Sequence, residues 1–314
     1  MRIGIDAMGG DFFPKAPVEG AVQAKAAWPE LELVLVGQRD RIEQELKALD
    51  ASADDFAILH ADEYVEMNES ASQALRSKPN SSIQVGINAH KAGELDAFLS
   101  AGNTGALLAT ALFGMGLLDG VERPTVGGLY PVNGTYSFLL DVGANIDCKP
   151  PLLVQLGVIG STFMRTMFDL DEPRVALLNI GEEPGKGTQT VQDAYKLFEE
   201  QKLVNFIGNV EGRDMIAHKA DVYVTDGFTG NILLKYAESF YHVLKEKADP
   251  NDDSVEAFNY ENVGGLPFLG VNGNVLVGHG ISGPYAFKQM ICRARETVEN
   301  DLTGQIRKAM QAFE

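Results

Sequence analysis

Cysteine is scarce in this chain: Cys148 and Cys292 are the only two, and they lie far apart. Two distant cysteines provide neither a disulfide framework nor closely spaced metal ligands, which favours a reducing, cytoplasmic setting. Basic residues are scarce as well, because 26 Lys and Arg stand against 44 Asp and Glu, for a formal net charge of -18. Nucleic-acid binders present a basic surface, so we expect no nucleic-acid partner.

The chain also lacks a convincing membrane span. Residues 97–118 carry no charge and are nearly long enough to cross a bilayer, but Ser100, Asn103 and Thr104 lie inside this stretch and no basic cluster flanks it. We therefore interpret it as a buried strand and helix. The N-terminus begins directly with a short apolar strand that ends near Asp6, so we expect no signal peptide.

Short apolar strands alternate with helical segments along most of the sequence. Strands that start new strand-turn-helix units are expected at 2–7, 31–36, 56–60, 97–100, 175–179, 221–225 and 274–277. This alternation predicts a mostly parallel sheet covered by helices on both faces, which is a three-layer αβα sandwich. We expect a single α/β domain over residues 1–314.

Two segments depart from this alternation. The runs 125–130 and 137–141 have strand character, and Asn133-Gly134 between them is typical of a tight turn, so we expect an antiparallel hairpin. Residues 248–254 are acidic and contain Pro250. We interpret them as the exposed tip of a short helical hairpin that protrudes at about residues 236–260.

Glycine, asparagine and aspartate gather where the strands end. They form five loops, at 8–11, 100–105, 141–145, 179–187 and 226–231. Ligands of open parallel sheets bind at the carboxyl ends of the strands. We therefore expect these loops to converge on one crevice.

Several familiar catalytic motifs are missing. The run from Gly181 to Gly187 is similar to a phosphate-binding P-loop, but its spacing is one residue short and Gly187 stands where Ser or Thr would hold magnesium. No G-x-G-x-x-G follows the first strand, no G-x-S-x-G is present, and the five histidines show no metal-ligand spacing. Nucleotide triphosphatases, nicotinamide enzymes, serine hydrolases and metalloenzymes are therefore disfavoured.

The turn Ser-Ala-Gly-Asn-Thr-Gly at residues 100–105 lies between a buried strand and a helix. A helix that starts there directs unpaired amide groups and the positive end of its dipole toward one spot, which suits an anion. An ordinary strand-to-helix turn with Thr104 as the helix N-cap is the alternative.

The remaining loops supply groups that bind an oxyanion without titrating. Asparagine amides such as those of Asn145, Asn179 and Asn231 can hold a phosphate or a developing carbonyl oxyanion, and Lys186 would add positive charge. A surface position at the start of a helix is the alternative for Lys186. Cys148 is a candidate nucleophile, but no histidine is near it in the sequence, and a buried thiol is the better interpretation.

Three further polar residues in these turns have two interpretations each. Asp141 and Asp226 follow strands, where a carboxylate can orient amides or bind a cation, and turn formation is the alternative. His279 stands between two glycines, which makes it a candidate for the pocket, and a hydrogen-bonded turn histidine is the alternative.

The chain carries, in this order, the motifs D-A-M-G-G-D, S-A-G-N-T-G-A, D-V-G-A-N-I-D-C-K-P, L-L-N-I-G-E-E with the following K-G, and D-G-F-T-G-N-I-L-L-K. Together they resemble the bacterial phosphate acyltransferase family over almost the whole chain. The resemblance implies transfer of a fatty acyl group from acyl carrier protein to inorganic phosphate. The acyl phosphate would then feed a membrane glycerol-phosphate acyltransferase in phospholipid synthesis.

The same resemblance implies a homodimer and a fold similar to isocitrate and isopropylmalate dehydrogenases and to phosphate acetyltransferases. Carried onto this chain, the catalytic residues are Lys186 and Asn231. Phosphate is itself the nucleophile and a thiolate is a tolerable leaving group, so we expect no cofactor and no metal. Our hypothesis is that residues 100–105 hold phosphate, that Lys186 attracts it, and that Asn231 faces the thioester carbonyl.

The candidates for binding phosphate or other parts of the substrate all lie in the loops at the strand ends. They are Ser100, Gly102, Asn103, Thr104, Gly105, Asn145, Asp226, Gly227, Thr229 and His279.

Two features of the sequence, one residue and one segment, depart from the family pattern. Phe12 stands where members usually have a histidine after G-G-D, and the hairpin at about residues 236–260 is short and acidic where the family has a longer apolar one. In the family the longer hairpin serves membrane contact and carrier docking, so the short hairpin here argues against direct membrane attachment. We expect a cytoplasmic protein, and a peripheral place at the membrane is the alternative.

Acyl carrier protein is acidic, so an acidic enzyme needs a local basic patch to receive it. The candidates are Lys235, Lys245, Lys247, Lys288, Arg293 and Arg295. Two other functions remain open: a short-chain acyltransferase of the same fold that uses coenzyme A, and a non-catalytic protein that binds the carrier or a lipid.

Overall fold

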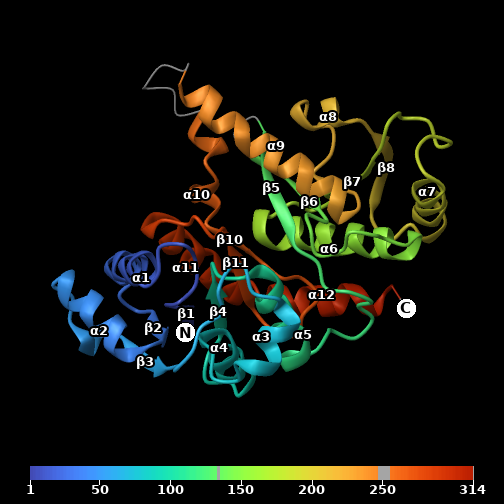
Figure 1. Ribbon diagram of the computed structural model, residues 1–314. Helices are drawn as coiled ribbons and strands as arrows, with labels where there is room; N and C mark the ends of the chain where they lie inside the picture. The colour runs from blue at the N-terminus through green and yellow to red at the C-terminus, as the bar shows by residue number, and fades with distance from the viewer. Residues whose placement is uncertain (133–134, 247–254, 314) are drawn as a thin grey trace. The chain divides into compact units, whose positions relative to one another are not determined.

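The computed structural model describes residues 1–132, 135–246 and 255–313, and the chain divides into two compact units (Figure 1). Unit 1 comprises Met1–Gly116 and Tyr260–Glu299, and unit 2 comprises Leu117–Asn259 and Asn300–Glu314. The expectation of a single domain over residues 1–314 stays a prediction.

Unit 1 contains a mostly parallel sheet with the strand order β10-β11-β4-β1-β2-β3. Within it, β10 pairs antiparallel with β11, and the other pairs are parallel. The strands are β1 (Arg2–Asp6), β2 (Glu32–Gly37), β3 (Ala57–His60), β4 (Ala97–Ser100), β10 (Gly265–Pro267) and β11 (Val275–Gly278). The carboxyl ends of β11, β4 and β1 therefore lie side by side at one edge of the sheet.

Helices cover both faces of this sheet. Ile3 and Ile5 of β1 belong to a buried core that α1 and α11 complete, whereas Gly4 between them faces Phe98. Helix α4 covers this second face, because Gly86 leaves room for the Phe98 ring. The helices of unit 1 are α1 (Lys15–Ala27), α2 (Arg39–Ala48), η1 (Ala53–Asp55), α3 (Ala71–Ser77), α4 (Ser82–Lys91), α5 (Thr104–Met115), α10 (Tyr260–Val263) and α11 (Pro284–Glu299).

Unit 2 contains a second mostly parallel sheet with the strand order β5-β6-β9-β7-β8. Here β5 and β6 pair antiparallel, and the other pairs are parallel. The strands are β5 (Gly127–Val132), β6 (Thr135–Leu140), β7 (Arg174–Leu178), β8 (Asn205–Val210) and β9 (Val222–Val224). The carboxyl ends of β6, β9 and β7 are thus neighbours.

Helices also lie on both faces of the second sheet. Leu140 and Val222 meet α6 at Gly160, whereas Leu139 and Tyr223 point the other way, into a core that α8 and α9 complete. The helices of unit 2 are α6 (Pro150–Phe168), α7 (Gln189–Gln201), α8 (Gly212–Ile216), α9 (Gly227–Lys245), η2 (Val255–Phe258) and α12 (Leu302–Gln311).

The α/β class, the mostly parallel strands and the layers of helices are confirmed, but the strands belong to two sheets. The predicted antiparallel hairpin is confirmed as β5 and β6, although its Asn133-Gly134 turn lies outside the described residues. Sequence analysis missed β8, an edge strand whose side chains alternate poorly between apolar and polar. The C-terminal segment contains two helices, α11 and α12, which separate at Asn300 and Asp301.

The described arms of the expected hairpin at residues 236–260 are the end of α9 and η2. Tyr241 Oη donates a hydrogen bond to Glu256 Oε1 at 3.1 Å, and Lys245 Nζ lies 3.3 Å from the same oxygen. These contacts hold η2 against α9. The predicted acidic tip at 248–254 lies outside the described residues. Within the described part of the chain, every helix is too short or too polar to cross a membrane.

Candidate active site

In unit 1, the loops that follow β1, β4 and β11 contact one another at the carboxyl edge of the sheet. The Asp11 amide donates a hydrogen bond to the Gly280 carbonyl at 2.7 Å, which joins the loops after β1 and β11. Gly9 lies against the loop after β4, where an added Cβ would stand 2.7 Å from Ser100 Oγ and 2.9 Å from Gly102 N. Glycine at position 9 therefore allows the two turns to approach.

The buried carboxylate of Asp6 organises this group of turns. Ser100 Oγ donates to Asp6 Oδ2 at 2.7 Å and accepts from the Gly102 amide at 2.9 Å, while the Met8 amide donates to Asp6 Oδ1 at 3.0 Å. Burial raises the pKa of Asp6, and hydrogen bonds from Ser100, Ser82 and Met8 oppose that rise. Ser100 is itself fully buried, so its hydroxyl shapes the turn.

Asn103 begins the helix that follows. Its Oδ1 accepts the Ala106 amide at 3.0 Å, which makes Asn103 the N-cap of α5. Its Nδ2 donates to three backbone carbonyls, the shortest contact being 2.8 Å to Glu69. The alternative that named Thr104 as the N-cap is therefore wrong by one residue, because Thr104 is the first residue inside the helix.

Thr104 and Gly105 are the exposed part of this turn. No described residue accepts a hydrogen bond from the amide of either one, as expected for the first turn of a helix. These two amides and the Thr104 hydroxyl are the groups at residues 100–105 that remain available to an anion.

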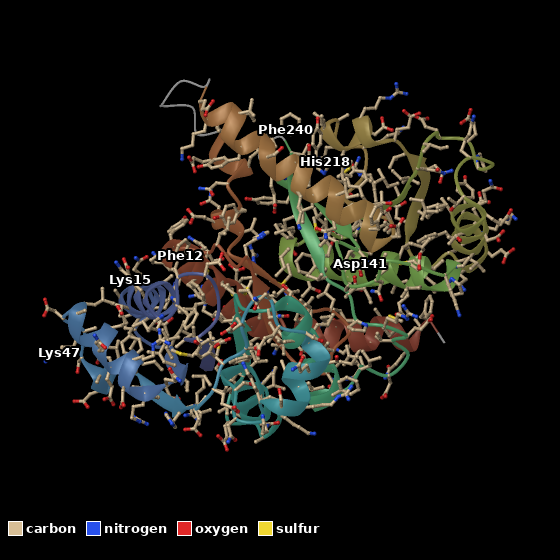
Figure 2. All side chains as sticks on the ribbon, viewed as in Figure 1. Phe12, Lys15, Lys47, Asp141, His218 and Phe240 are labelled. Carbon is tan, nitrogen blue, oxygen red and sulfur yellow. The ribbon has the colours of Figure 1, made fainter. Side chains whose placement is uncertain are left out.

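His279 and Phe12 lie in the neighbouring loops of unit 1. His279 is exposed and packs edge-on against Tyr260, with 5.1 Å between the ring centroids. Phe12, which is labelled in Figure 2 and stands where the resemblance led us to expect a histidine, has an exposed fraction of 57%. Beside it, Asp11, Phe13, Tyr64 and other residues line a cavity of about 280 Å³.

In unit 2, the buried carboxylate of Asp141 occupies the position at the end of β6 (Figure 2). Asp141 Oδ1 accepts the amides of Gly143 and Ala144, both at 2.7 Å. Its Oδ2 accepts Thr125 Oγ1 at 2.8 Å and Asn145 Nδ2 at 2.7 Å. Four donors thus satisfy both oxygens, and Asp141 orders the turn at residues 141–145.

Asn145 connects the loop after β6 to the start of α9. It is buried, and its Nδ2 donates to the Pro124 carbonyl at 2.8 Å as well as to Asp141. Its carbonyl accepts the Gly227 amide at 2.7 Å. A Cβ on Gly227 would stand 2.6 Å from that carbonyl oxygen, so only glycine fits there. Asn145 and Gly227 therefore fix the start of α9.

Asn231 lies on the first turns of α9 beside the loop after β6. An added Cβ on Gly143 would stand 3.3 Å from Asn231 Nδ2, so the amide rests against this glycine. Asn231 is half-buried, and no described residue forms a hydrogen bond with its side chain. Asp226 precedes the helix and accepts from both the amide (2.8 Å) and the hydroxyl (2.9 Å) of Thr229.

Lys186 lies on the loop between β7 and α7. Its side chain is exposed, and its ammonium has no acceptor or acidic partner among the described residues. Asn179, which directly follows β7, donates from Nδ2 to the Lys186 carbonyl at 3.1 Å. Because β7 and β6 both flank β9, the loops that carry Lys186 and Gly143 leave the same edge of the sheet.

Cys148 is a poor nucleophile in this setting. Burial raises the pKa of its thiol to about 12, and the negative charges of Asp141 and Asp226 add to the rise. The thiol donates weakly to the Asn145 carbonyl at 3.6 Å. The Cys148 side chain is half-buried, so it is more accessible than the buried thiol that we expected. Within the described residues, no group of three His, Cys, Asp or Glu side chains has the arrangement of a metal site.

The structure brings the candidate residues together in two groups. One group lies in unit 1 around Asp6 and comprises Ser100, Gly102, Asn103, Thr104, Gly105 and His279. The other lies in unit 2 and comprises Asn145, Asp226, Gly227, Thr229 and Asn231, with Lys186 on a loop at the same sheet edge. Convergence of all these loops on one crevice stays a prediction.

Sequence analysis did not give Asp6 or Asn209 a part in the site. Asp6 ends an apolar strand directly before a glycine turn, the same signal that singled out Asp141, and this signal could have found it. Asn209 donates from Nδ2 to the Glu183 carbonyl at 3.0 Å, in the loop of Lys186. It escaped notice because β8 was not predicted.

Known families and proteins match the chain over nearly its full length. A family model described as fatty acid synthesis protein matches residues 1–305. The phosphate acyltransferase of Salinibacter ruber is 41% identical over 331 residues, covering 99% of this chain and 98% of that protein. The phosphate acyltransferase of Halothermothrix orenii is 38% identical over 327 residues, covering 98% of each chain.

Solved structures with the same fold have much lower sequence identity. A phosphotransacetylase from Streptococcus pyogenes has a TM-score of 0.63 at 18% identity, covering 95% of this chain and 94% of that one. A branched-chain phosphotransacylase from Enterococcus faecalis V583 has a TM-score of 0.63 at 16% identity, covering 95% and 99%. At these identities the likeness concerns the fold alone.

Proposed function

Because this chain belongs to the phosphate acyltransferase family, an acyltransferase family of lipid synthesis, we propose that it transfers a fatty acyl group from acyl carrier protein to inorganic phosphate. The product is an acyl phosphate, whose mixed anhydride keeps the acyl group activated. A membrane glycerol-phosphate acyltransferase would consume it in phospholipid synthesis.

The reaction needs two reactants held in line and one developing charge stabilised. A phosphate oxygen attacks the thioester carbonyl carbon, the carbonyl oxygen becomes an oxyanion, and the carbon–sulfur bond then breaks to release the carrier thiolate, which takes a proton from solvent. No acyl-enzyme is required, because phosphate is the nucleophile. The high pKa of Cys148 supports direct attack, since this thiol stays protonated near neutral pH.

We assign the oxyanion contact to Asn231. One observation carries this assignment: its amide is half-buried beside Gly143, yet no described residue forms a hydrogen bond with it. A side-chain amide that donates to no protein group has both of its N–H bonds available to a ligand. A fixed donor of this kind contributes about 100- to 1000-fold in rate.

We assign anion binding in unit 1 to the exposed amides of Thr104 and Gly105, and attraction of phosphate in unit 2 to Lys186. The amides stand at the start of α5, where the helix dipole favours an anion. Lys186 supplies a positive charge that no described acidic residue neutralises. The internal hydrogen bonds of Ser100, Asn103 and Asn145 support positioning roles for these three residues.

The experiment is release of free thiol from acyl carrier protein, measured with and without phosphate. We expect release only with phosphate, Asn231→Ala slower by about 100- to 1000-fold, and Lys186→Ala with a phosphate KM raised by about 10-fold or more. Circular dichroism checks that both variants fold. Wild-type rates in both variants would end the assignments.

The same assay separates the alternative functions. A preference for acyl coenzyme A indicates the short-chain alternative, and no turnover with either donor indicates a binding protein.

For the acidic carrier protein, we propose Lys235 as the first contact. Of the described basic candidates, Lys245 pairs with Glu256, Arg293 with Glu296 and Arg295 with Glu299. Lys288 lies over the Trp28 ring at 5.8 Å, and Lys247 lies outside the described residues. Lys235 is exposed, has no ion-pair partner among the described residues, and stands one helical turn after Asn231.

We also propose that the chain forms a homodimer through α9. Four apolar side chains spaced by four residues, Phe228, Ile232, Tyr236 and Phe240, are 41–62% exposed and form a stripe along this helix. We expect a dimer by light scattering that Tyr236→Glu dissociates and that Ile216→Glu, a change at an exposed apolar residue of α8, leaves intact. A monomeric wild type that floats with anionic vesicles would instead assign the stripe to peripheral membrane contact, where the consuming acyltransferase resides.

A further inference from the structure

Two asparagines at the ends of neighbouring strands hold the loop that carries Lys186. Asn179 directly follows β7, and Asn209 is the second-last residue of β8. Both lie at the carboxyl edge of the unit 2 sheet, where β7 and β8 are parallel neighbours. Their amides point into the loop at residues 180–187 and bind its backbone.

Asn209 reaches Lys186 through one shared carbonyl. Asn209 Nδ2 donates to the Glu183 carbonyl at 3.0 Å, and the Lys186 amide donates to the same oxygen at 3.0 Å. The position of the Lys186 backbone therefore depends on a carbonyl that Asn209 fixes from the sheet.

Asn179 holds the other side of Lys186. Its Nδ2 donates to the Lys186 carbonyl at 3.1 Å, and its Oδ1 accepts the Ile180 amide at 2.8 Å. Gly187 follows with a φ of +84°, a conformation that favours glycine, and lets the chain pass over Asn179. Both the amide and the carbonyl of Lys186 are thus placed by asparagine contacts.

Other restraints on this loop are weaker. Lys219 Nζ lies 2.7 Å from Glu182 Oε1, but the two side chains are 38% and 56% exposed, and exposed ion pairs contribute little. The Lys186 side chain itself contacts Gly181, where an added Cβ would stand 3.0 Å from Lys186 Cγ. Gln192 Nε2 also donates to the Gly187 carbonyl at 3.1 Å. The two asparagines bind the Glu183 and Lys186 carbonyls and thereby restrain the Lys186 backbone.

One feature of the Asn209 side chain lowers the free energy of unfolding, which a purely structural role would not explain. Its side chain is buried, and its Oδ1 has no hydrogen-bond partner among the described residues. A buried unpaired carbonyl oxygen destabilises the fold. The Nδ2 contact to the loop is the benefit that offsets this cost.

We propose that Asn209 and Asn179 are positioning residues, which hold the loop so that Lys186 meets phosphate. The proposal rests on the role given to Lys186 under the proposed function, and it adds residues that do not touch the substrate. Their amides are used on backbone carbonyls, so they act through Lys186 alone.

The test compares Asn209→Asp with Asn205→Asp. Both residues lie on β8 and donate from Nδ2 to a backbone carbonyl, Asn205 to that of Glu172 at 3.4 Å. The change keeps the shape, removes the donor and adds one negative charge, which is the same in both variants. We expect Asn209→Asp to raise the phosphate KM by about 5- to 10-fold with the KM for acyl carrier protein unchanged, and Asn205→Asp to match the wild type.

A second variant guards against a folding defect. Asn179→Asp keeps the oxygen that accepts the Ile180 amide, loses the donor to the Lys186 carbonyl and adds one negative charge, so we expect at least the same rise in phosphate KM. Trypsin gives a readout that does not depend on activity, because it cuts after Lys186. Either variant should be cut there about 5-fold faster than the wild type.

Combination with Lys186→Ala separates this proposal from the proposed function. If the asparagines act through Lys186, adding Asn209→Asp to Lys186→Ala changes the rate no further. A slow Lys186→Ala beside wild-type kinetics and cutting in both asparagine variants overturns the positioning roles alone. Additive losses in the double variant also overturn them. Wild-type kinetics in Lys186→Ala overturns the role of Lys186, and the positioning proposal falls with it.

Discussion

Replacement of Asp141 by asparagine should destabilise unit 2 severely, although the two side chains have the same shape. In the structure, each carboxylate oxygen of Asp141 accepts two hydrogen bonds, from Gly143 and Ala144 on one side and from Thr125 and Asn145 on the other. An asparagine amide offers one oxygen and one NH2 group, and the NH2 group can only donate. Whichever way it is placed, two donors lose their acceptor.

The magnitude follows from these two hydrogen bonds, which the asparagine cannot accept. A hydrogen bond to a charged acceptor contributes about 1.5–3 kcal/mol, so removing two predicts a cost of about 3–6 kcal/mol. Domains of this kind have total stabilities of about 5–15 kcal/mol, so the change removes a large part. With a urea m-value of about 3 kcal/mol/M, the unfolding midpoint should fall by about 1–2 M.

Urea unfolding followed by far-UV circular dichroism measures this shift. The single tryptophan, Trp28, belongs to unit 1 and gives a separate fluorescence signal from that unit. Thr125→Val is the matched control, because it removes one donor and leaves both Asp141 oxygens as acceptors. It should cost about 1.5–3 kcal/mol, half of the cost expected for Asp141→Asn, because it removes one hydrogen bond to the carboxylate and not two. A midpoint in Asp141→Asn within about 0.3 M of the wild type would refute the reasoning, since it would mean that the four hydrogen bonds contribute almost nothing.

Three other predictions follow from the geometry. Burial lowers the pKa of His90, whose Nε2 accepts the Asn274 amide at 2.9 Å. The stability that neutral His90 contributes is therefore present above pH 6.5 and is lost as the pH falls through the lower folded pKa. Urea midpoints from Trp28 fluorescence should show this acid loss in the wild type and a weaker one in His90→Gln. Cys148→Ser should keep wild-type turnover, and the native thiol should react with iodoacetamide far more slowly than after unfolding, because its pKa is about 12. Asn103→Ala should lower the free energy of unfolding by about 1–3 kcal/mol and Thr104→Ala by less than about 0.5 kcal/mol in the same urea assay, since Asn103 is the N-cap of α5.

Much of the fold could be predicted from the sequence because its signals are local. Apolar runs followed by glycine turns and amphipathic segments mark the strand-helix units, and the pairing of β5 with β6 follows from two adjacent runs. The division into two sheets has no such signal. Strand β11 pairs with β4 across a separation of more than 170 residues, and no short window reports a pairing of that kind.

The chemistry of the loops was predictable, but the use of each side chain was not. Asn103 and Thr104 are both good N-cap residues, and only the backbone conformation determines which of them caps α5. In the sequence, Asn145 and Asn231 both end a predicted loop that contains glycine. In the structure Asn145 is buried and its amide binds Asp141, whereas the amide of Asn231 lies unpaired beside Gly143. The difference arises from tertiary packing across separate loops.

The two units order their glycine turns in the same way. Each places a buried aspartate at the end of a central strand, Asp6 on β1 and Asp141 after β6, and each carboxylate orders a glycine turn through short polar side chains. The polar residues of each loop thus divide into an inner set that binds the aspartate or the backbone and an outer set that keeps free donors. Substitution in the inner set should change the free energy of unfolding first and activity second. For the outer set, to which Thr104, Lys186 and Asn231 belong, the order should reverse, and the ratio of the two effects assigns each loop residue to its set.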